Sequence, residues 1–155
     1  MRATATFGAL LALFACGDPV APVSVGAVYQ LRSINGEPLP WSPPISDSGY
    51  VPQMVTEGWI TFVDASNAQR HERSEGWVTD AGGNRVPLIY DWTLSATYEQ
   101  LAGKIVLSYP PSPGGGSGAD TLYLGLHSSL ILRQTTGYLA PLDTVVRHFC
   151  TAAAC

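Results

Sequence analysis

The feature that most constrains this chain is a strict two-residue alternation between Leu88 and Tyr98. Large apolar side chains occupy the even positions, and mostly polar side chains occupy the odd ones. Successive side chains of a β-strand point to opposite faces, whereas a helix repeats every 3.6 residues, so few helices could accommodate this pattern. The segment therefore predicts a long strand with one buried face and one exposed face.

Shorter segments with the same period lie on both sides of this strand, and no segment has a convincing helical pattern. Turn signals separate them, among them Asn35-Gly36 and residues 80–84. About eight strands of this kind predict an all-β fold, an antiparallel up-and-down barrel. A sandwich remains open, because periodicity does not specify strand order. The other expected strands are 27–34, 58–63, 69–78, 104–109, 121–126, 129–134 and 144–149.

The N-terminus looks like a processing segment. Arg2 precedes a short apolar run that ends in Leu13-Phe14-Ala15-Cys16, which resembles the lipobox of bacterial lipoproteins. The resemblance implies cleavage before Cys16 and attachment of a diacylglyceryl group and a further acyl chain such as palmitate. We expect a signal peptide at 1–15, a lipid anchor and tether at 16–25, and one barrel domain at 26–155. The alternative is an ordinary secretory signal with a cysteine there by chance.

The remaining cysteines, Cys150 and Cys155, form an even pair in a chain expected to reach an oxidising compartment. The short loop between them can be closed by a disulfide bond, which we predict. The alternative is a frayed tail with free thiols. A metal site is not expected, because two thiolates without a nearby histidine pair give too few ligands for zinc.

The opening of the domain carries a second resemblance. Residues 29–40, Tyr-Gln-Leu-Arg-Ser-Ile-Asn-Gly-Glu-Pro-Leu-Pro, look like the start of small lipocalin-like envelope lipoproteins. Residues 57–62, 90–109 and 130–149 are similar in kind to later strands of that family. META-type envelope domains open in a similar way and are the runner-up. The lipocalin resemblance implies a barrel that can hold one small apolar ligand, although Gly26-Ala27-Val28 stands where a Gly-x-Trp is expected.

Five aromatic residues fall on the faces expected to point into the barrel. Such rings can line an apolar ligand pocket with polar tips, or they can fill a small core. We favour packing and keep the pocket as the alternative. The residues are Tyr29, Tyr90, Trp92, Tyr98 and Tyr109.

Residues 70–75, Arg-His-Glu-Arg-Ser-Glu, form a run of alternating charge on an expected strand. Arg70 and Glu72 share one face, opposite His71, Arg73 and Glu75. We expect a solvated edge that resists aggregation. A polar lining or a docking edge is the alternative interpretation.

Several chemistries find no support in the sequence. The net charge of −4 and a single lysine, Lys104, argue against a nucleic-acid partner. Ser117 lacks a complete nucleophile elbow, and His71, His127 and His148 have no metal-ligand spacing. Residues 115–123 match one calcium-binding nonapeptide, but a single copy cannot complete a site, so we expect a glycine loop. No catalytic residue, metal or cofactor is therefore expected, and a hydrolase is the least favoured function.

Together these features predict a non-enzymatic protein anchored in the bacterial cell envelope. Gly17 after the cysteine favours the outer membrane, facing the periplasm or the outside, although Asp18 leaves this open. The first hypothesis is that the protein holds a small apolar molecule or stabilises the envelope. The second is an interaction module whose loops at 38–52 and 110–119 dock an unknown protein partner.

Overall fold

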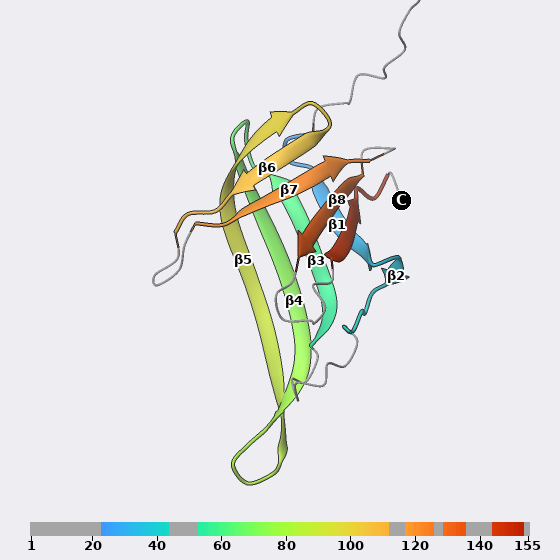
Figure 1. Cartoon of the computed structure of the whole chain (residues 1–155), viewed down its shortest axis with the longest axis vertical. Helices are drawn as coiled ribbons and strands as arrows, with labels where there is room; N and C mark the ends of the chain where they lie inside the picture. Colours follow the sequence, from blue (N-terminus) through green and yellow to red (C-terminus); the bar gives the residue numbers. More distant parts are fainter. Residues whose placement is uncertain (1–22, 44–52, 112–116, 126–128, 136–143, 154–155) are drawn as a thin grey trace, which may run out of the picture.

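In the computed structural model, the described residues are 23–43, 53–111, 117–125, 129–135 and 144–153, and their regular elements are all β-strands (Figure 1). The described part contains no helix with the length and hydropathy of a membrane span. The expected signal peptide and Cys16 lie outside the described residues. The strands are β1 (Val28–Ile34), β2 (Glu37–Pro38), β3 (Met54–Phe62), β4 (Asn67–Thr79), β5 (Arg85–Leu101), β6 (Lys104–Ser108), β7 (Ala119–Leu124), β8 (Leu130–Thr135) and β9 (Thr144–Cys150).

The strands form one antiparallel sheet that closes on itself. From β3 to β9 each strand pairs with the next in the chain, and β1 pairs with both β3 and β9. Of the nine strands, only β2 lies outside this ring, so eight strands form a closed barrel. The predicted up-and-down barrel is confirmed, and the sandwich is excluded because β1 and β9 are hydrogen-bonded.

The turn after β1 forms as its sequence predicts. Asn35 and Gly36 both have positive φ angles, 53° and 84°, and Ile34 pairs directly with Glu37. A two-residue hairpin whose central residues both have positive φ matches the right-handed twist of its strands. Asn35 also accepts the backbone N–H of Val146 at 2.8 Å through its side chain, so the turn contacts β9 as well.

The interior of the barrel is filled mainly by apolar side chains. Phe62 lies between two tyrosines, with its ring centroid 5.7 Å from Tyr29 and 4.8 Å from Tyr98 in edge-on arrangements. The expected strand at 58–63 did not specify its orientation, and the structure points Ile60 and Phe62 inward. Other buried core residues are Leu31, Ile34, Ile105, Leu107, Leu122, Leu130, Leu132, Val145 and Phe149.

The barrel wall changes where β5 extends beyond its neighbour β6. β5 pairs with β4 along most of its length, from Arg85 to Thr97, but with β6 only from Thr97 to Leu101. Residues 85–96 of β5, here called the open edge, therefore have a strand on one side only among the described residues. Beyond the last β3 partner, at Glu75, the β4–β5 ribbon continues alone as a long hairpin, the arm, at the lower end of Figure 1.

Candidate functional site

The open edge offers backbone hydrogen-bonding groups to a partner. The N–H of Tyr98 donates to the carbonyl of Ser66, beside β4, at 2.7 Å. Backbone groups of successive strand residues point to alternate sides, so even positions of β5 face β4 and odd positions face the open edge. Pro87 occupies an odd position, where its missing N–H removes no bond to β4. Within the described part of the chain, the residues whose N–H and C=O both lack a strand partner on this side are therefore Arg85, Ile89, Asp91, Thr93 and Ser95.

Large apolar side chains accompany these backbone groups. Ile89 is 54% exposed, Tyr90 47% and Leu94 44%. Native proteins usually cover, shorten or charge an edge strand, because a long apolar edge is a template for pairing with another chain. Exposed apolar side chains continue along the arm towards its tip, where they are Trp77, Val78 and Val86.

The tip of the arm is a turn closed by hydrogen bonds to the side chain of Asp80. The carboxylate of Asp80 accepts the backbone N–H groups of Gly82 and Asn84 at 2.9 and 2.8 Å. These bonds, first of all that from Asn84, lower the pKa of Asp80 from its ordinary value. The turn joins β4 to β5 at a fixed register, so the open edge is held as an extended strand.

Behind the open edge, the barrel contains a buried network of charged and polar side chains. Arg70 on β4 donates to Asp120 on β7 at 2.6 Å. Arg147 on β9 donates to Glu72 through Nε at 2.9 Å and to Gln134 at 2.7 Å. Gln134 in turn donates to Asp120 at 2.8 Å. The two arginines and two carboxylates balance in charge, which is what a buried set of ions requires.

The pKa values in this network reflect burial and close charges. Burial alone would lower the pKa of Arg70, but the carboxylates of Glu72 and Asp120 outweigh it and raise that pKa. For Arg147, burial dominates and lowers the pKa, despite the attraction of Glu72. Burial also raises the pKa of Tyr109, which therefore keeps its proton and donates to Asp120 at 2.8 Å.

The network contacts the middle of the open edge through Trp92. The guanidinium carbon of Arg70 lies 5.2 Å from the centre of the indole ring, within the range of a cation–π interaction. Glu72 is the β4 residue directly paired with Trp92. The ionic network thus fixes one inner-face side chain in the middle of the edge, while Tyr90 and Leu94 on either side of it remain exposed.

The expectation of a solvated edge at residues 70–75 is wrong for two of its charged residues. Arg70 and Glu72 are buried inside the barrel, as the alternative of a polar lining had it. The prediction that Arg70 and Glu72 share one face of the strand was correct. The opposite charges that allow their burial, Asp120 on β7 and Arg147 on β9, are distant in the sequence. On the outer face, Arg73 and Glu75 form a partly exposed ion pair at 3.2 Å.

The five predicted aromatic residues make different contacts within the described part of the barrel. Tyr29 and Tyr98 pack around Phe62, which agrees with the favoured packing interpretation. Trp92 contacts Arg70, and Tyr109 binds Asp120. Tyr90 lies on the inner face, as its parity predicts, but it is exposed because the barrel wall opens beside it.

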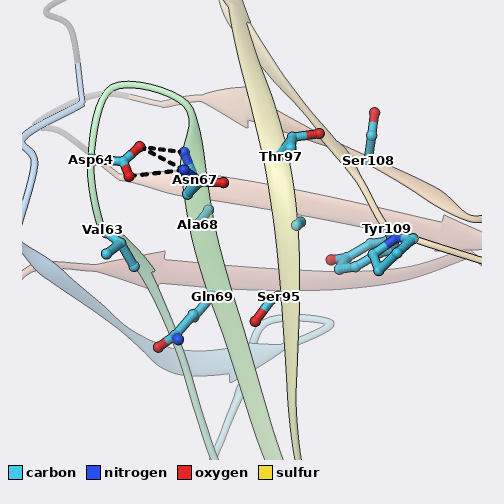
Figure 2. Close-up of a pocket in the computed structure, with 11 residues that line it drawn as sticks. Val63, Asp64, Asn67, Ala68, Gln69, Ser95, Thr97, Ser108 and Tyr109 are labelled. Atoms are coloured by element: carbon cyan, nitrogen blue, oxygen red, sulfur yellow. Dashed lines mark hydrogen bonds between the residues drawn. The ribbon is translucent and has the colours of Figure 1, made fainter.

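An open pocket of about 560 Å³ lies where β5 and β6 separate. Figure 2 shows Ser95 and Thr97 on β5, with Ser108 and Tyr109 on the neighbouring segment. Further lining residues come from the β3–β4 turn and the start of β4, so the pocket lies between that turn and the end of the open edge.

Figure 2 also shows the carboxylate of Asp64 bonded to Asn67 at the β3–β4 turn. Hydrogen bonds from Asn67 and Ser66 lower the pKa of Asp64 to about 2.

Other predicted residues have varied outcomes. Cys150 is buried at the end of β9, but Cys155 lies outside the described residues, so their disulfide stays a prediction. Ser117 is exposed before β7. His71 stacks on Trp59 on the outer face, with ring centroids 5.1 Å apart. His148 is half-buried on β9, and His127 is outside the described residues.

Sequence reasoning missed the network partners Asp120, Gln134 and Arg147. A signal for Arg147 was present, because it shares a strand face with Val145 and Phe149, which the alternation predicts to point inward. Asp120 was considered only as part of a glycine-loop motif. Each of these residues lies two positions from a buried residue on its own strand and therefore shares that residue's inward face.

Comparison with protein-family models, with curated proteins and with solved structures gives no match. The resemblances to lipoproteins and to lipocalin-like domains therefore stay predictions.

Proposed function

We propose that this chain is a lipid-anchored cell-envelope protein that acts as an interaction module. Its binding surface is the open edge of β5, to which an extended polypeptide segment adds as a further strand. The observation that carries this proposal is the run of residues 85–96, which lacks a second strand neighbour in the described structure and carries exposed apolar side chains.

Strand addition at this edge would give the edge-facing backbone groups hydrogen-bond partners and would cover the exposed apolar side chains. The backbone groups of Ile89, Asp91, Thr93 and Ser95 give hydrogen bonds that do not depend on the partner's sequence. Alternate side chains of the added strand then pack on the inner face beside Trp92. A partner with apolar residues at every second position fits this surface.

The expected tether meets the barrel at the end opposite the arm. The backbone N–H of Val23 donates to the side chain of Gln100 at 3.3 Å, and Gly26 donates to the carbonyl of Phe62 at 2.8 Å. Gln100 is near the end of β5, whereas the open edge occupies its first part. The first described residue of the tether, Val23, thus lies at the end of the barrel away from the open edge.

Binding of a small apolar ligand has weaker support. Two of the five predicted pocket residues, Tyr29 and Tyr98, fill the core around Phe62, and Tyr90 is exposed on the arm side. The loops expected to dock a partner are only partly described, since 44–52 and 112–116 are not. The open edge is the more specific candidate.

Replacing Cys16 with serine should release the protein from membranes, because the thiol that carries the lipid is then absent. The measurement is the share of protein in the membrane pellet and in the soluble fraction after cell lysis. A Ser117→Ala variant is the control and should stay with the membrane. A Cys16→Ser protein that remains in the pellet would show that the anchor is elsewhere.

Photo-crosslinking tests the open edge directly. A photoreactive amino acid at Ile89 should give one discrete polypeptide adduct in cells, because this position lies beside the added strand. The same group at Tyr123, an exposed position on β7, is the control and should give none. Adding Thr93→Pro should abolish the Ile89 adduct. Adducts of equal yield at both positions, or insensitive to Thr93→Pro, would contradict the proposal.

A further inference from the structure

We infer that the segment added to the open edge is β5 of a second copy of this chain. The inference rests on the proposed function and names its partner. Two copies related by a twofold axis would pair their open edges antiparallel, so that the two sheets become continuous. The sequence of the edge decides which register this pairing takes.

Two simple registers are disfavoured by residues on the edge. A register centred on Asp91 sets the Asp91 carboxylates of both copies directly opposite each other, and like charges in that position are destabilising. A register centred on Tyr90 sets Pro87 opposite Thr93. Because proline has no N–H, each such pair loses a hydrogen bond.

The register centred on Trp92 avoids both defects. Asp91 then lies opposite Thr93 of the second copy, and Ile89 lies opposite Ser95. These odd positions are the ones whose backbone groups face the open edge, so they form the hydrogen-bonded pairs. On the inner face, Tyr90 meets Leu94 of the second copy, and the two Trp92 side chains meet at the axis. Large apolar side chains therefore face each other across the non-hydrogen-bonded pairs, where side chains approach most closely.

The ends of the edge fit the same register. Pro87 of one copy falls opposite Thr97 of the other, which is already paired with Ser108, so the missing N–H removes no bond. Beyond this point the incoming chain must turn away from β6, and an open pocket lined by Ser95, Thr97 and Tyr109 lies at that place. Proline thus limits pairing to residues 89–95, the part of the edge that is self-complementary.

Such a dimer is small by the standard of stable interfaces, so we expect a dissociation constant in the micromolar range. Anchoring on one membrane raises the effective concentration of the copies. Antiparallel pairing places the barrels at opposite ends of the joined ribbons.

A mixed cysteine experiment tests partner and register together, using detergent-extracted full-length protein. Tyr90→Cys and Leu94→Cys variants should form a crosslinked dimer when mixed under mild oxidation, because these positions oppose each other. Each variant alone is the matched control and should give no dimer above wild type. Both residues are exposed, so neither substitution disturbs the core. If Tyr90→Cys formed a crosslinked dimer by itself, the pairing would be centred on Tyr90, and the register centred on Trp92 would be overturned.

A proline substitution tests the edge without new cysteines. Thr93→Pro removes an edge-facing N–H and should raise the dimer dissociation constant by about tenfold or more in analytical ultracentrifugation. Thr93→Val keeps the N–H and should leave it unchanged. A wild-type protein that stays monomeric up to about 1 mM would overturn the dimer. An Ile89 adduct that is sensitive to Thr93→Pro but lacks the mass of two chains would also overturn it, while still supporting binding at the open edge.

Discussion

Replacing Glu72 with glutamine should lower the free energy of unfolding by about 3–5 kcal/mol. Glu72 accepts hydrogen bonds from Arg147 at 2.9 and 3.3 Å and from Arg70 at 3.4 Å. Without its charge, two buried guanidinium groups share the single carboxylate of Asp120. The amide nitrogen of the new side chain would also face donors rather than acceptors. Urea unfolding followed by circular dichroism measures the change.

Glu75→Gln is the matched control, because Glu75 lies on the same strand and is also paired with an arginine. The side chains of its pair with Arg73 are 38% and 41% exposed, and ion pairs in contact with water contribute at most about 1 kcal/mol. The two glutamine variants therefore differ mainly in burial. Equal losses of stability in both would mean that the network inside the barrel does not contribute as a buried set of ions.

Replacing Tyr29 with alanine should also destabilise the barrel by about 3–5 kcal/mol, the range for loss of a large buried aromatic side chain. The Tyr29 side chain is buried and packs edge-on against Phe62. Its removal leaves a cavity that the closed sheet cannot collapse to fill. Thermal unfolding and urea unfolding at low protein concentration both report this loss.

Tyr123→Ala is the control, since Tyr123 is 45% exposed on the outer face of β7. Its contact with Arg133 is an exposed cation–π pair, so its loss should change stability by less than about 1 kcal/mol. A small effect at Tyr29 would contradict the packing interpretation. It would then favour a space beside Phe62 that a ligand could occupy.

Much of the barrel could be predicted from local pattern. The alternation at 88–98 predicted a strand, and the structure extends it to Arg85–Leu101. The Asn35-Gly36 turn formed because only residues tolerant of positive φ suit a two-residue hairpin. The parity of Arg70 and Glu72 was also correct. These features depend on neighbouring residues, which a single sequence displays directly.

The candidate site was harder to predict, because it depends on pairing between distant segments. The burial of Arg70 could not be predicted from residues 70–75, since its counter-charge Asp120 comes from β7. The exposure of Tyr90 follows from the early end of β6, not from any property of β5 itself. Side-chain periodicity specifies a face but not whether another strand covers it.

The sequence by itself determined the alternation of faces, the main turns and the strand content of this protein, because these follow from local backbone geometry. Only the tertiary structure decided that β1 meets β9 and that four charged side chains balance one another inside the barrel. It also decided that residues 85–96 of β5 lack a second strand neighbour among the described residues. The reason is physical: closure, charge compensation and edge exposure are relations between strands. They exist only when distant parts of the chain have come together.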